Sequence, residues 1–198
     1  MIPRWEWRTF GETFGGAEVR LTALPPTSVN ESEELYVLSS RVEASIKVRD
    51  GKLDVKRLER RSEDGLEQWK PVAEAEFPLA AADVEALLAA LRVRVPTLGR
   101  ETYALDELID EVVEPVADLV AVPVHKDRAH HLLDGCPVEL TELRSSARTT
   151  RTIAVEDEDP ALVRATVEGL GLWSRPNTSV PRGLAGLLEL DWRWPEPS

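Results

Sequence analysis

The chain has 198 residues, 42% of them hydrophobic, and this length suits one domain over 1–198 with a sizeable core. Its formal net charge of −12 argues against general nucleic-acid binding, which depends on a net basic surface. A single cysteine excludes an intramolecular disulfide, and no run of eighteen apolar residues indicates a membrane span. We therefore expect a cytoplasmic protein without a nucleic-acid or membrane partner.

The first predicted element is a strand, RWEWRTF, in which polar and bulky residues alternate. Arg4, Glu6 and Arg8 share one face of this strand. Trp5 and Trp7 share the other face, and two aromatic side chains on one strand face usually belong to the core. The strand therefore has one charged face and one buried face.

A polar stretch containing Pro-Pro leads to a short predicted strand around 35–38, and the hairpin IKVRDGKLDVKR follows. Its Asp50-Gly51 pair is a strong signal for a two-residue turn. Lys47 and Arg49 share one face of the first strand of this hairpin, and apolar residues share the other. Paired cations in an acidic protein either form a solvated surface or hold an anion.

The next strand, LEQWKPVAEAEFP, places Glu74 and Glu76 on one face. Two helices are then predicted. The stretch 78–93 is rich in alanine and has apolar residues at helical spacing. The stretch 101–115 is acidic on its exposed side and ends at Pro115.

Three more strands are predicted at 120–133, 137–144 and 150–157. A helix follows them, with Asp159 as its N-cap and Pro160 at its first position. A short helix over 179–190 and a tail over 191–198 complete the chain. Because tight hairpin turns cannot join parallel strands, the fold class is α+β with a mainly antiparallel sheet.

Most of these strands carry charged residues at alternate positions. On an open sheet this face is simply the one in contact with water. In an antiparallel barrel or tunnel with helices packed outside, the same face lines the interior. There, cations surround phosphate oxygens, and clustered carboxylates hold Mg²⁺ or Mn²⁺ through oxygen ligands.

Other kinds of site have weaker support. His130 and His131 point to opposite faces of one strand, and His125 does not complete a zinc-binding set with suitable spacing. The sequence has no phosphate-binding loop of the Gly-rich, Lys-Ser/Thr kind, no nucleophile elbow and no dinucleotide fingerprint. The acidic run 156–159 favours the start of a helix over a metal site.

The order of the charged pairs resembles the CYTH superfamily, the triphosphate tunnel metalloenzymes. The segments that carry the resemblance are, in chain order, RWEWR, IKVR with DVKR, EAEF, VHKDR, VELTEL, IAVE and NTSVPRGLAGLL. They span nearly the whole chain, although each motif is short. The resemblance implies an antiparallel β-tunnel with helices packed outside.

The resemblance also implies roles for individual residues. The phosphate-binding residues implied are Arg8, Lys47, Arg49, Lys56, Lys126 and Arg128. The carboxylates implied to face metal and water are Glu6, Glu74, Glu76, Glu139 and Glu156, with catalytic roles for Glu6, Glu76 and Glu156. The cofactor implied is Mg²⁺ or Mn²⁺.

The chain departs from the family pattern at four positions. Arg4, Thr141 and Ala154 stand where the family has carboxylates, and Val180 stands where it has a tyrosine. Three hypotheses follow. The protein hydrolyses polyphosphate, tripolyphosphate or an organic triphosphate with a divalent metal. Alternatively it is a binding module that keeps the cations without turnover, or a scaffold whose acidic face or DWRWP tail docks a basic protein partner.

Overall fold

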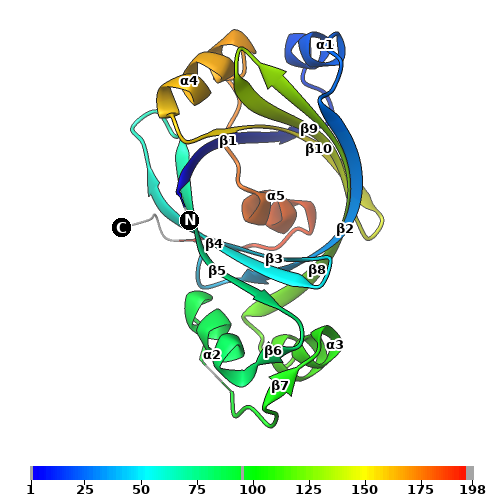
Figure 1. Ribbon diagram of the computed structural model, residues 1–198, viewed down its shortest axis with the longest axis vertical. Helices are drawn as coiled ribbons and strands as arrows, with labels where there is room; N and C mark the ends of the chain where they lie inside the picture. Colours follow the sequence, from blue (N-terminus) through cyan, green and yellow to red (C-terminus); the bar gives the residue numbers. More distant parts are fainter. Residues whose placement is uncertain (1, 95, 195–198) are drawn as a thin grey trace.

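The computed structural model describes residues 2–94 and 96–194, and its centre is a closed barrel of antiparallel strands (Figure 1). Around the barrel the strands follow the order β1-β10-β9-β8-β2-β3-β4-β5, and β5 pairs with β1 to close it. The barrel strands are β1 (Arg4–Gly11), β2 (Ser28–Ser39), β3 (Ala44–Arg49), β4 (Lys52–Arg61), β5 (Glu67–Glu76), β8 (Leu119–Leu133), β9 (Cys136–Ser145) and β10 (Arg148–Asp157). The predicted α+β fold with an antiparallel barrel is confirmed.

Helices lie around the barrel, and two very short strands pair with each other outside it (Figure 1). The helices are α1 (Gly16–Thr22), α2 (Ala81–Ala90), α3 (Leu105–Leu108), the π-helical turn η1 (Ile109–Val113), α4 (Pro160–Gly169) and α5 (Val180–Leu187). The short strands are β6 (Leu79–Ala80) and β7 (Thr102–Tyr103). None of the described helices is long and apolar enough to cross a membrane.

The predicted hairpin turns are present because the sequence supplies residues that tolerate positive φ. Asp50 and Gly51 join β3 to β4 with φ of 52° and 72°, and Asp134 and Gly135 join β8 to β9 with φ of 52° and 88°. Positive φ at both central positions matches the right-handed twist of the flanking strands. These tight turns make the strand pairs antiparallel.

Most apolar side chains of the barrel strands point outward, so most of the core lies between the barrel and its helices. One cluster packs the outer faces of β3 and β4 against α2, including Ile46, Val55 and Leu88. A second packs Trp5 and Trp7 on β1 with residues of α1 and α4. The predicted buried role of the two tryptophans is confirmed. Inside one end of the barrel a third cluster, including Leu38, Val122 and Leu143, packs on Leu184 of α5, and polar residues line the cavity beside it.

Two local predictions were wrong. The strand expected around 35–38 is the twelve-residue β2, because Ser28–Ser39 pairs along its whole length with β8. That pairing outweighs a polar stretch that reads as a loop by itself. The helix expected over 101–115 spans only Leu105–Val113 and changes to π-helical geometry at Ile109.

Helix α1 and the short strands β6 and β7 were not predicted, whereas the remaining elements lie where the sequence places them. Asp159 caps α4, its side chain accepting a hydrogen bond from the Ala161 amide. Cys136 is fully buried. The predicted C-terminal helix is α5, whereas residues 195–198 of the predicted tail lie outside the described residues.

Helix α5 covers one end of the barrel and appears within the ring of strands in Figure 1. Ser179 caps it by accepting a hydrogen bond from the Arg182 amide. Its close approach to β1 depends on Gly183, because a Cβ there would overlap the Phe10 ring. A Cβ on Gly186, one turn later, would meet no atom within 4 Å.

This contrast predicts opposite effects of two substitutions in one helix. Gly183→Ala should lower the free energy of unfolding by about 1–3 kcal/mol, because Phe10 or the helix must shift. Gly186→Ala should leave it unchanged or raise it by up to about 1 kcal/mol, since alanine favours a helix more than glycine does. Urea unfolding of both variants checks this, and equal effects would contradict the described docking of α5.

Candidate functional site

The barrel encloses a cavity of about 350 Å³ lined mainly by polar side chains. Nine of the eleven site residues predicted from the sequence line it. They are Glu6, Arg8, Lys47, Arg49, Lys56, Lys126, Arg128, Glu139 and Glu156. Ser179, Val180 and Pro181, at the start of α5, also contribute to the wall.

Strand pairing explains why residues far apart in sequence meet in this cavity. Directly opposite residues of neighbouring strands point to the same face. Glu6 lies opposite Glu156, and Arg8 lies opposite Ala154, which in turn lies opposite Glu139. The alternation of charges seen in each strand therefore becomes one continuous charged wall.

Arg8 connects the carboxylates of β1 and β9. Its Nε donates to Glu6 Oε1 at 2.9 Å, and its Nη1 lies 3.4 Å from Glu139 Oε1. Arg128 Nε lies 3.5 Å from the other oxygen of Glu139. Burial opposes ionisation of Glu139, but the charges of Arg8, Lys126 and Arg128 outweigh it and lower its pKa to about 2.

Glu34 on β2 is the most deeply buried of the carboxylates in this wall. Its oxygens lie 3.0 Å from Lys126 Nζ, 2.6 Å from Arg128 Nη2 and 3.5 Å from Arg49 Nη1. Burial opposes its ionisation, but Lys126, Arg128 and Lys47 bring its pKa down to about 2. Burial lowers the pKa of the Lys126 ammonium to about 8, against the opposing effect of Glu34.

Sequence reasoning missed Glu34, although a signal was present. Ser32, Glu34 and Tyr36 alternate in the same way as the charges of the other strands. Because the strand was expected to begin only around residue 35, the alternating residues just before it were interpreted as part of a loop. The pairing of β2 with β8 extends this strand and includes Glu34 in it.

No family model and no curated protein matches this chain. Among solved structures it is similar to a Hippeastrum protein, proposed as an adenylyl cyclase and described as having a dominant triphosphatase activity. The two are 16% identical with a TM-score of 0.51, over 96% of each chain. The fold is CYTH-like.

Two further solved structures resemble it less. A Bacillus halodurans protein, proposed as an adenylate cyclase, is 12% identical with a TM-score of 0.46, over 90% of this chain and 96% of that one. A conserved hypothetical protein from Pyrococcus furiosus is 14% identical with a TM-score of 0.47, over 92% of this chain and 99% of that one.

The CYTH-like barrel leaves Glu74 and Glu76 outside the cavity lining. They face the inner side of β5, opposite Asp54 and Lys52, but near the end of the β4–β5 hairpin. There they line a second hollow of about 670 Å³, which shares Lys47, Arg49 and Asp54 with the cavity. Glu76 lies 3.2 Å from Lys52 Nζ and is largely exposed.

The replaced positions of the CYTH pattern make contacts with the remaining carboxylates. Arg4 Nη1 lies 3.0 Å from Glu156 Oε1, and Thr141 Oγ1 donates to Glu139 Oε1 at 2.7 Å. The small side chain of Ala154 lies between Arg8 and Glu139 in the register, so the Arg8 guanidinium can reach across it. Each of these three replacements is therefore accompanied by a contact that pairs one of the remaining carboxylates, Glu139 or Glu156.

A divalent cation fits this cavity only in part. Glu6 and Glu156 are direct neighbours across β1 and β10 and both line the cavity. Mg²⁺ is commonly held by one or two carboxylates together with substrate phosphates and water. These two residues suit that arrangement, with oxygen ligands also from Glu139, but no described trio of cavity carboxylates converges closely enough to form a cage by itself.

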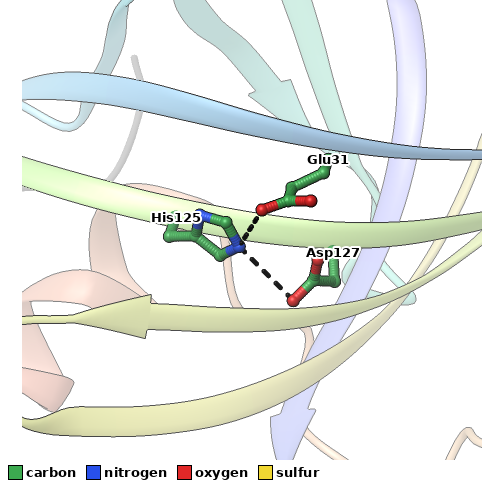
Figure 2. A group of neighbouring side chains, drawn as sticks. All are labelled: Glu31, His125 and Asp127. Atoms are coloured by element: carbon green, nitrogen blue, oxygen red, sulfur yellow. Dashed lines mark ion pairs between the residues drawn. The ribbon is translucent and has the colours of Figure 1, made fainter.

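The described residues place three ligand atoms close together at one position, and it lies on the outer face of the barrel (Figure 2). His125 Nε2 is 3.2 Å from Glu31 Oε1 and 3.5 Å from Asp127 Oδ2. His125 Nδ1 is hydrogen-bonded to Glu33 at 2.6 Å, and this bond raises the pKa of His125. A protonated imidazole accounts for all these contacts, so we treat the group as an ion-pair cluster.

Two buried carboxylates under α5 form a separate network that sequence reasoning also missed. Arg61 lies between them, 3.0 Å from Glu43 and 2.9 Å from Glu67. Arg182 of α5 pairs with Glu43 at 2.7 Å. Burial and the charge of Glu43 raise the pKa of Glu67 to about 7, although Arg61 opposes this.

The raised pKa of Glu67 predicts a pH dependence of stability. Because its folded pKa exceeds its unfolded value, its stabilising contribution is full below about pH 4.5 and is lost as pH rises through about 7. The parent should lose about 2–3 kcal/mol of unfolding free energy over this window. Glu67→Gln should remove most of that slope.

Urea unfolding of the parent and variant between about pH 5 and pH 8 measures the slope. Glu59→Gln is the matched control, because Glu59 is a solvent-accessible carboxylate on β4 that lies 3.5 Å from Lys70. It should keep the parent slope. A parent whose stability does not change over this range would show that Glu67 ionises normally.

Proposed function

We propose that the protein binds a short chain of phosphoanhydride-linked phosphates in the barrel cavity and hydrolyses it. Substrates of this class are tripolyphosphate, short polyphosphate and the triphosphate group of an organic molecule. The observation that carries the proposal is six cationic side chains lining one cavity of about 350 Å³ in a chain with net charge −12. The cations of this lining outnumber its carboxylates, so an anion of high charge density is the ligand that complements it.

The cations are suited to hold phosphate oxygens. Arg128 and Arg8 are fixed by carboxylates on one side, which orients their remaining N–H groups. Preorganised donors stabilise developing charge without reorganising during the reaction. No described carboxylate forms an ion pair with Lys56, so its charge is available to a ligand.

The carboxylates suit the orientation of water. We assign Glu156 and Glu6 to this role because they are neighbours across two strands and both reach the cavity. Bound Mg²⁺ or Mn²⁺ would supply neutralisation of phosphate charge, with Glu6, Glu139 and Glu156 as oxygen ligands. Glu74 and Glu76 would meet only the part of a substrate that extends beyond the cavity.

A second candidate function is a binding module that holds the same anion without turnover. The ion pair between Arg4 and Glu156 favours the binding module, because this pairing engages a carboxylate that hydrolysis requires. Thr141 and Ala154, where the resemblance places carboxylates, favour it as well. A scaffold for a basic protein partner remains the alternative if no phosphate ligand binds.

Phosphate release separates these candidates. Purified protein should release phosphate from tripolyphosphate in the presence of Mg²⁺ or Mn²⁺, and chelation by EDTA should stop the release while binding persists. Calorimetric binding without release under any metal condition would support the binding module. Neither binding nor release would exclude both functions.

The two kinds of cavity residue should fail in different ways. Arg49→Ala and Lys126→Ala should weaken tripolyphosphate binding by about 10- to 100-fold, because each removes a charge-assisted contact. Glu156→Gln should bind near parent affinity in EDTA yet lose about 100-fold or more of metal-dependent release. Calorimetry and phosphate assays on the same preparations measure the contrast.

Residues on the outer face provide matched controls. Lys70 follows the cavity-facing Trp69 on β5 and points outward, and Glu142 lies on the outer face of β9 opposite Asp127. Lys70→Ala and Glu142→Gln should bind and hydrolyse as the parent does. If all five cavity and surface substitutions behaved alike, the assignment of the cavity as the binding site would be wrong.

A further inference from the structure

Three cations of the cavity wall converge on Glu34. Glu34 Oε1 accepts a hydrogen bond from Arg128 Nη2 at 2.6 Å and lies 3.5 Å from Arg49 Nη1. Its Oε2 lies 3.0 Å from Lys126 Nζ and accepts from the Tyr36 hydroxyl at 2.9 Å. The same hydroxyl accepts from Lys126 Nζ at 2.6 Å. One buried carboxylate thus fixes three side chains that face the ligand.

Glu34 itself is screened from the cavity. Its side chain has no exposed surface, whereas Lys126, Arg128 and Arg49 line the cavity directly. Of these cations, Lys126 depends most on it, because the ammonium is buried and Glu34 is the carboxylate nearest to it. A buried ammonium without a nearby negative charge tends to lose its proton.

We propose that Glu34 is a positioning residue that holds Lys126 and Arg128 toward the ligand and keeps Lys126 charged, so that anion binding depends on a carboxylate that never touches the anion. This inference rests on the proposed function of the cavity. It adds Glu34, which is not part of the cavity lining, to the residues on which anion binding depends.

The electrostatics of Lys126 support this role. Burial lowers its pKa to about 8, and Glu34 is the largest influence that raises it again. Arg128 and Arg8 lower it further. Without Glu34 the amine would face those two guanidinium groups with less compensation and would be neutral near physiological pH.

A simple count of charges predicts the opposite sign. Removing a carboxylate beside an anion site removes repulsion, so the anion should bind more tightly. The positioning role predicts weaker binding, because the loss of the carboxylate also discharges Lys126 and frees Arg128. Glu34→Gln therefore decides between the two by the direction of its effect.

The experiment is calorimetric titration of tripolyphosphate in EDTA at about pH 6 and about pH 7.5, both below the pKa of the parent Lys126. Glu34→Gln should bind more weakly than the parent, by about tenfold at the higher pH and by less at the lower pH. The matched control is Glu142→Gln, because Glu142 is a carboxylate on the outer face of β9, opposite Asp127. It should bind as tightly as the parent or more tightly at both pH values.

A second substitution tests the route through Lys126. An arginine remains charged at both pH values, so Glu34→Gln combined with Lys126→Arg should lose the added pH dependence. Glu34→Asp keeps the charge but shortens its reach, and should shift the pH profile in the same direction by less. Thermal melts establish folding, and if Glu34→Gln does not fold, Glu34→Asp decides.

Three outcomes overturn the inference in distinguishable ways. If the parent binds tripolyphosphate and the Glu34 variants bind as tightly with the parent pH profile, Glu34 has no positioning role and the proposed function stands. If the parent does not bind tripolyphosphate at all, the proposed function fails and this inference fails with it. A purely structural role would weaken binding equally at both pH values, which also contradicts the inference.

Discussion

Charges enclosed by a barrel must be paired, and this constraint governs the structure. An unpaired ionised group in a water-poor interior costs several kcal/mol, whereas a paired and hydrogen-bonded one is tolerated. The barrel satisfies this constraint by placing side chains of opposite charge next to one another. Arg8 pairs with Glu6 and Glu139, and Glu34 pairs with Lys126 and Arg128. The result is a wall of fixed charges in which buried partners such as Glu34 orient the charged groups that face the cavity.

The inward charges also determine where the hydrophobic core lies. Because side chains alternate along a strand, a charged interior requires an apolar exterior, and that exterior must be covered. Helices α2 and α4 cover it on different sides of the barrel, and α5 covers one end. Substitution of a core residue therefore acts on the shape of the cavity through the strand that carries both faces.

The sequence was informative where one strand alone carries the signal. Alternation within β1, β3 and β8 predicted which residues point inward, and Asp-Gly pairs predicted the turns. It was uninformative where the signal belongs to two strands together. The polar start of β2 is a strand only because β8 pairs with it, so Glu34 was missed. Glu74 and Glu76 point to the inner face of β5, as predicted, but they lie beyond the cavity. Glu43 and Glu67 meet only through the closed barrel.

The replacements at Arg4, Thr141 and Ala154 change the charge balance of the cavity. Counting Glu34 with the lining residues, six lysines and arginines stand against five carboxylates, so the wall carries a small positive excess. Carboxylates at 141 and 154 would reverse that excess and would need a bound cation to offset it. Here Thr141 and Ala154 instead allow Arg8 and Arg128 to engage Glu139. Under the proposed function, such a wall would retain the phosphate chain without a metal, and a metal would act chiefly on the hydrolysis of the bound chain.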